Sequence, residues 1–128
     1  MRASGRDRAA TAAVGRSAGF VTAEVAVLLP ALTLLTALCV SAVGAAVVHV
    51  RCLDAARTGA RAVSRDEPVD VVLTETRARA PAGSEVRLER LPGGLVAVEV
   101  TATARLAGRF GPGIRVGGDV VAAGEGDP

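Results

Sequence analysis

The hydrophobic pattern is dominated by one long apolar run near the N-terminus. Residues 25–50, which are 26 residues counted from 25 through 50, contain no Asp, Glu, Lys or Arg, and only His49 could ionise. About 20 apolar residues cross a hydrocarbon core of roughly 30 Å as a helix. Pro30 and Gly44 do not contradict this, because transmembrane helices tolerate both residue types. The pattern therefore predicts a transmembrane helix over residues 20–50.

The pattern then changes to that of an amphipathic helix. Leu53, Ala56, Ala60 and Val63 recur at a spacing of three to four residues, while Arg and Asp take the other positions. This predicts a stem helix over residues 51–66 that projects from the bilayer. Pro68 suits the first turn of a new helix, so a short second helix is expected over residues 69–80.

From Ser84 onward, apolar and polar residues alternate with a period of two, which is typical of half-buried strands. Pro92-Gly93-Gly94 separates two such runs and predicts a β-hairpin, whose apolar face packs against the second helix or the stem. Residues 114–122 are a third strand candidate, weakened by Gly117-Gly118, which we interpret as turn glycines.

The expected fold class is α+β: a long N-terminal transmembrane helix with an amphipathic stem, then a short helix and a small antiparallel β-sheet of two or three strands. The head covers residues 67–123, and residues 124–128 are expected to be a disordered tail.

Composition narrows the functional classes. The 128 residues carry a net charge of +2, all 15 basic residues are Arg, and they are interleaved with acids, so no basic stripe for nucleic acid is present. Phe20 and Phe110 are the only aromatic residues. On one helix Cys39 and Cys52 would lie about 20 Å apart, too far for an internal disulfide. An intermolecular bridge through Cys52 stays open.

Catalytic chemistry has little to use in this sequence. There is no Ser in a G-x-S-x-G setting, no pair of His residues and no metal-ligand spacing. His49 falls at the end of the apolar run and is expected to be an interfacial residue. We therefore expect no enzyme, no metal and no cofactor.

The residues around the start of the apolar run are the candidate functional site. Residues 1–19 form a basic leader with four Arg and one Asp, expected to be unstructured. Glu24 follows five residues after Gly19. Placing a carboxylate within a bilayer costs a few kcal/mol, so an acidic residue at this position is expected to have a function. The alternative is that Glu24 lies among the headgroups and caps the helix start.

Gly19, Phe20 and Glu24, between a basic leader and an apolar span, resemble the processing site of type IV pilin-like proteins. The resemblance implies that a prepilin peptidase cuts between Gly19 and Phe20 on the cytoplasmic side, that the new N-terminus is methylated, and that Glu24 becomes the fifth mature residue. The runs A-E-V-A-V-L-L-P (residues 23–30) and A-A-R-T-G-A-R (residues 55–61) resemble TadE-like minor pilins of the tight-adherence branch.

The resemblance also implies partners and a location. The partners are other pilin-like subunits, the prepilin peptidase, the platform membrane proteins of a pilus or secretion assembly used in adhesion, and the lipid bilayer. The N-terminus would be cytoplasmic and the head extracytoplasmic, at the cell membrane or in a surface pilus. In the family, the acid pairs with the N-terminal amine of a neighbouring subunit. Small residues would allow close helix contacts: Ala31, Ala37, Ser41, Gly44 and Ala45.

Two other interpretations stay open. One is a membrane-anchored module whose head binds an extracytoplasmic ligand. The other is a secreted protein with a cleaved signal sequence, although the apolar run is longer than an ordinary signal core of about 7–15 residues. Charge does not settle the topology, because four Arg precede the run and four follow it within fifteen residues.

Overall fold

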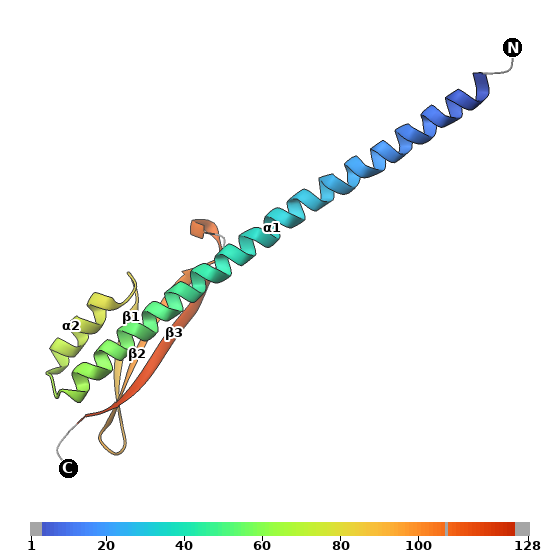
Figure 1. The fold of residues 1–128 in the computed structure, drawn as a ribbon. Coiled ribbons are helices and arrows are strands. Elements are labelled where there is room, and N and C mark those ends of the chain that lie inside the picture. Colours follow the sequence, from blue (N-terminus) through green and yellow to red (C-terminus); the bar gives the residue numbers. More distant parts are fainter. Residues whose placement is uncertain (1–3, 107, 125–128) are drawn as a thin grey trace. The chain divides into compact units, whose positions relative to one another are not determined.

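The computed structural model describes residues 4–106 and 108–124. Its elements follow the predicted α+β order (Figure 1): helix α1 (Ser4–Ser64), helix α2 (Val69–Arg79), strands β1 (Glu85–Leu91) and β2 (Leu95–Arg105), a 3₁₀ turn η1 (Gly108–Phe110), and strand β3 (Gly113–Ala123). The chain divides into two compact units, Met1–Ala37 and Leu38–Pro128. The second unit contains the end of α1 and the whole α/β head.

The leader differs from its expected unstructured state. Helix α1 begins at Ser4, so the leader from that residue onward is helical, while residues 1–3 lie outside the described residues. Four of the five residues 9–13 are Ala, the best helix former. Because they extend a helix that already exists, they avoid the nucleation cost that an isolated peptide would meet. Pro30 lies inside α1, and the helix continues on both sides of it.

A hydrogen-bonded cap ends α1, close to the predicted break at residues 66–68. The amide of Asp66 donates to the carbonyl of Val63 at 2.9 Å, and the amide of Glu67 donates to that of Ala62 at 3.2 Å. This pair of bonds is the Schellman motif, and it requires that the residue directly after the helix C-cap adopts the left-handed backbone conformation. Asp66 takes that conformation with φ 58°, which Asp tolerates better than most side chains.

Helix α2 starts directly after Pro68, as predicted, and ends at Arg79, with Ala80 as its C-cap. Its buried side chains are Val72 and Thr76. Arg65 pairs with the turn after α1 and with α2, because its Nε lies 2.6 Å from Oε1 of Glu67 and its Nη2 lies 3.4 Å from Oε2 of Glu75. These ion pairs are exposed, so the packing of Val72 and Thr76 contributes more to the position of α2 than the charges do.

The sheet is antiparallel with strand order β1-β2-β3, so the third strand is confirmed. The predicted turn at Pro92-Gly93-Gly94 joins β1 to β2, and Gly93 and Gly94 have φ of +83° and +74°. The amide of Gly124 donates to the carbonyl of Gly94 at 2.9 Å. Gly124, expected to begin a disordered tail, is therefore fixed to the hairpin turn, and residues 125–128 lie outside the described residues.

The interpretation of Gly117-Gly118 as turn glycines is wrong. Both lie inside β3, where Gly117 pairs with Thr101 and Gly118 with Val100. A Cβ on Gly118 would collide with the side chain of Leu53 on α1. Gly118 is therefore a point of close approach between sheet and helix, one of the recognised uses of glycine within a strand.

The hydrophobic core lies between the stem, defined here as residues 51–64 of α1, and one face of β2. Its buried residues are small or branched: Cys52, Ala55, Ala56, Ala60, Val98, Val100 and Ala102. The expectation that the sheet packs against the stem or the second helix is thus confirmed, and the buried helical residues of this core all belong to the stem. Full burial of a valine stabilises the fold by about 1.5–3 kcal/mol, so β2 is a principal source of stability.

Gly59 is the closest point of this packing. A Cβ at this position would collide with Oγ1 of Thr76 on α2 and would lie 2.9 Å from Cγ1 of Val98 on β2. The stem, α2 and the sheet therefore meet at one residue that has no side chain. Both colliding neighbours, Thr76 and Val98, are themselves fully buried and have little room to move.

We expect Gly59→Ala to destabilise the head by about 1–3 kcal/mol, because an added methyl overpacks this junction. Hydrogen exchange in the segment 95–105 should then accelerate by about 5- to 150-fold, as local opening becomes easier. Gly44→Ala is the matched control, because nothing lies within 4 Å of a Cβ there. Equal exchange in both variants would show that the junction is not tightly packed.

Candidate processing and assembly site

The three candidate site residues lie on one exposed stretch of α1, within the first compact unit. Gly19, Phe20 and Glu24 are all exposed, and the exposed fraction of Phe20 is 83%. Phe20 and Glu24 are four residues apart, so their side chains lie on the same face of the helix about 6 Å apart along its axis. The helix thus places the predicted cleavage position and the acid on a single face.

Glu24 forms no hydrogen bond or ion pair with any residue whose side chain the structure describes. It does not cap the helix start in the intact chain, because α1 begins at Ser4, twenty residues earlier. The capping interpretation is therefore wrong for the uncleaved chain. If cleavage removed residues 1–19, Phe20 would become the helix N-terminus. Glu24 would then lie near the end of α1 at which the macrodipole favours a negative charge.

Gly19 has no packing role in the structure. A Cβ built there meets nothing within 4 Å, in contrast to Gly59 and Gly118. A glycine inside a helix costs about 1 kcal/mol relative to alanine, so its presence has no explanation in the packing of the chain. Gly15 shares this property. What distinguishes Gly19 is its position directly before Phe20 and five residues before Glu24.

The side chains that follow Glu24 form an apolar and exposed helix surface. Exposed large residues continue from Val25 to Val50, and α1 is long and apolar enough to cross a membrane. The hydroxyls of Thr33 and Thr36 donate to the carbonyls of Leu29 and Leu32, each at 2.8 Å. Both polar groups are therefore satisfied within the helix, as a lipid environment requires.

The small residues expected at helix contacts divide into two groups. Ala31, Ala37 and Gly44 are exposed. Ser41 is buried with 9% exposure, and Ala45 is half-buried. Ser41 and Ala45 are continued along the helix by the half-buried Val48 and the fully buried Cys52, at spacings of four, three and four residues. We call these four residues the covered stripe.

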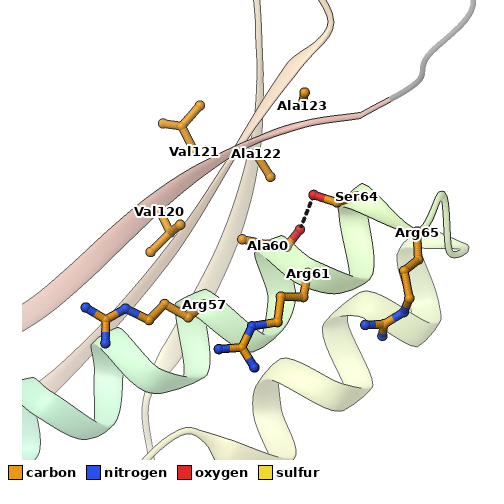
Figure 2. Close-up of a pocket in the computed structure, with 9 residues that line it drawn as sticks. All are labelled: Arg57, Ala60, Arg61, Ser64, Arg65, Val120, Val121, Ala122 and Ala123. Carbon is orange, nitrogen blue, oxygen red and sulfur yellow. Dashed lines mark hydrogen bonds between the residues drawn. The ribbon is translucent and has the colours of Figure 1, made fainter.

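A groove beside the stem was not predicted from the sequence. It has a volume of about 690 Å³ and is lined by side chains of α1 and the end of β3: Arg57, Ala60, Arg61, Ser64, Arg65, Val120, Val121, Ala122 and Ala123. Figure 2 shows the three Arg side chains along one side of the helix. Ser64 Oγ donates to the carbonyl of Ala60 at 3.0 Å. The sequence signal for this groove was the recurrence of Arg every four residues. The position of β3 beside these arginines is visible only in the fold.

The groove is positively charged. Arg65 is paired with Glu67 and Glu75, and its hydrogen bond to Glu67 raises its pKa above the usual value. Arg57 and Arg61 have no ion-pair partner among the side chains that the structure describes. The groove is wide and open, and β3 is an edge strand. This arrangement is suited to an anionic contact rather than to enclosing a small molecule.

The remaining chemical candidates are separated from one another. His49 is exposed, and within the described ranges no three His, Cys, Asp or Glu residues gather in a way that could hold a metal ion. Cys39 is exposed, whereas Cys52 is fully buried in the core, and burial raises the pKa of its thiol. An intermolecular disulfide through Cys52 would require the head to open, so the folded structure disfavours it.

Comparison of the chain with models of known protein families, with curated proteins and with solved structures gives no significant match. The resemblance to pilin-like proteins therefore rests on the residues around Gly19 and on the stem.

We expect Cys52 to resist a hydrophilic maleimide at pH 8 while the head is folded. Its thiol is inaccessible, and its raised pKa leaves less of the reactive thiolate than a free cysteine has. Mass spectrometry of a Cys39→Ser chain should show no label before unfolding in urea and one label afterwards. Adding Ser64→Cys, at an exposed stem position, should give one label in the folded protein. Rapid labelling of Cys52 in the folded chain would contradict this core.

Proposed function

We propose that this protein is a non-catalytic, membrane-anchored subunit of a pilin-like assembly, of the tight-adherence type that its sequence resembles. A prepilin peptidase would cut between Gly19 and Phe20, and the mature chain would assemble through α1. The observation that carries the proposal is Glu24: a carboxylate on an exposed apolar helix, with no partner among the described side chains, five residues after a glycine that has no packing role.

Cleavage would change the chemistry around Glu24. Hydrolysis of the peptide bond after Gly19 leaves an α-amino group on Phe20, with a reference pKa near 8, so it is largely protonated at neutral pH. Methylation would keep the charge. The acid and the new amine would lie one helical turn apart on the same chain, and the same two groups would be available to neighbouring chains. An unpaired carboxylate is costly at the edge of a bilayer, so a neighbouring amine would stabilise one register between packed helices.

The length of free helix supports the anchor. The head covers α1 from Ser41 onward, which leaves residues 20–40 of the mature chain without cover from the head. These 21 residues extend about 31 Å as a helix, close to the roughly 30 Å of a hydrocarbon core. The predicted span of residues 20–50 would then be shorter at its C-terminal end. The proposed orientation, with the head outside the cytoplasm, is supported by the processing motif, since the Arg counts on the two sides of the run are equal.

The exposed surface of α1 supports assembly through helix contacts. Ala31 and Ala37 are small and exposed, and they are six positions apart, so they lie about 120° apart around the helix and can each serve a different helix contact. Small residues let helix backbones approach closely in a membrane, where apolar burial no longer drives association. Glu24 would supply the charge pairing and these positions the close packing.

A second candidate function is a membrane-anchored binding module. The groove along Arg57 and Arg61 favours it, because two arginines with no ion-pair partner among the described side chains lie beside an edge strand and suit an acidic ligand. The mass of the membrane-extracted protein distinguishes the alternatives. Loss of residues 1–19 supports the pilin-like subunit, and an intact chain supports the binding module. Loss through about residue 46 would indicate a signal sequence, and would remove Ser41 and Ala45 from the covered stripe.

We expect Gly19→Leu to block maturation in cells that carry the peptidase, because a bulky side chain would occupy the position that the enzyme must accept before the scissile bond. Gly15→Leu is the matched control: it makes the same change one turn earlier, where a Cβ also meets nothing within 4 Å. Intact mass should show residues 1–19 retained only in the Gly19 variant. Normal processing of that variant would remove the basis of the proposed site.

We expect Glu24→Ala to leave cleavage intact and to reduce assembly. Glu24→Gln should behave in the same way, because it keeps the side-chain volume and removes the charge that would pair with the amine. Assembly can be measured by crosslinking single cysteines placed at Leu28, Leu32 or Leu35 in a Cys39→Ser chain. Mature protein with unchanged crosslinks in both variants would show that the carboxylate does not set the register.

A further inference from the structure

Phe110 is the most exposed large hydrophobic side chain that the structure describes, with 98% of its surface accessible. It ends η1, and we call the described residues 108–112 before β3 the β2–β3 connection. The other phenylalanine, Phe20, lies on the apolar helix, and the core contains no aromatic residue. An exposed aromatic at a loop tip therefore needs an explanation outside the packing of the head.

The position of this connection along α1 follows from contacts within the second compact unit. A Cβ on Gly118 would meet Leu53, and one on Gly124 would lie 3.5 Å from Cγ1 of Val63, so β3 runs along α1 in the same direction. The six positions from Gly118 to Gly124 thus match the ten positions from Leu53 to Val63 of α1. The same ratio places the start of β3, at Gly113, level with about residue 45 of α1.

The covered stripe gives an independent measure of the same position. Its first member, Ser41, is buried with 9% exposure, whereas Val40 and Val43 on other faces are 67% and 65% exposed. Figure 1 shows the β2–β3 connection at the end of the sheet nearest this part of α1. The head therefore reaches about ten residues into the charge-free run that ends at Val50.

This overlap fixes where the head meets the bilayer. The charge-free run of 26 residues is about 39 Å long, roughly 9 Å more than a hydrocarbon core. A span of about 20 residues that starts between Phe20 and Val25 ends between residues 39 and 44. That is the level of Ser41 and of the β2–β3 connection. If α1 spans the membrane, this connection lies at the membrane surface.

We infer that the β2–β3 connection is a membrane-surface anchor, and that Phe110 inserts among the lipids beside α1. The inference rests on the proposed membrane span. The occupant of the exposed face of Phe110 is lipid, because the connection lies level with the exit of its own helix from the bilayer. The head thus rests on the bilayer through two attachments, α1 and Phe110.

The test uses tryptophan as a probe, since the natural chain contains none. Three full-length variants are reconstituted singly into vesicles of phosphatidylcholine and phosphatidylglycerol, with or without bromine on the upper acyl chain, and fluorescence quenching is compared. Phe110→Trp reports on the connection. Leu95→Trp, at the opposite end of β2, is the control outside the membrane, and Leu32→Trp reports on the span itself.

We expect brominated lipid to quench Phe110→Trp and Leu32→Trp, with blue-shifted emission for both, and to leave Leu95→Trp unquenched. Quenching of Leu32→Trp alone, with Phe110→Trp open to aqueous iodide, would overturn the inference while the span stands. A Phe110→Trp signal shielded from both iodide and bromine would also overturn it, because the side chain would then be covered by protein. An unquenched Leu32→Trp would instead refute the membrane span.

Discussion

Close packing between the stem of α1 and β2 holds the head together, and it is possible only because the residues at the contact are small. Ala55, Ala56 and Ala60 let the sheet approach the helix, and Gly59 admits Val98 and Thr76 from two other elements. Gly118 performs the same role from the side of the sheet. The side chains of this core are small, so its stability depends more on how closely they fit together than on the area that they bury. The resemblance of residues 55–61 to a pilin-like stem thus coincides with the residues that the head needs in order to fold.

One helix serves two environments, and the division between them is visible in its side chains. From Phe20 to Val40 the apolar residues are exposed on all faces, as in a segment surrounded by lipid or by other helices. From Ser41 to Val50 a single stripe is covered by the head, and in the stem the buried positions widen to include Ala55, Ala56 and Ala62. Small residues therefore have different roles along the same helix. Ala31 and Ala37 remain available to other chains, whereas Ser41 and Ala45 are used by the chain's own head.

The sequence predicted the elements well because each has a strong periodic or local signal. The alternation around Val98 and Val100, the turn at Pro92, and the break before Pro68 all act within a few residues. Three features were not predicted from the sequence, because they depend on contacts between residues that are far apart along the chain. Gly117-Gly118 has the composition of a turn, but its role is set by Leu53, sixty-five residues earlier. The groove at Arg57 exists only because β3 lies beside the stem, and the extent of the covered stripe is set by the length of the sheet. Of the candidate site, the positions of Gly19 and Glu24 follow from the sequence, whereas their roles depend on other molecules.

The hydrogen bond from Gly124 to Gly94 has a mechanical consequence. It closes the end of the sheet farthest from the β2–β3 connection by tying the last residue after β3 to the hairpin turn between β1 and β2. Because β3 runs along α1 in the same direction, tension applied along the helix would load the contacts between helix and sheet in shear, across many residues at once. Peeling would have to begin at one end of the sheet, and at this end the backbone bond resists it. A subunit held by its helix could therefore transmit a pull to its head without first unravelling it.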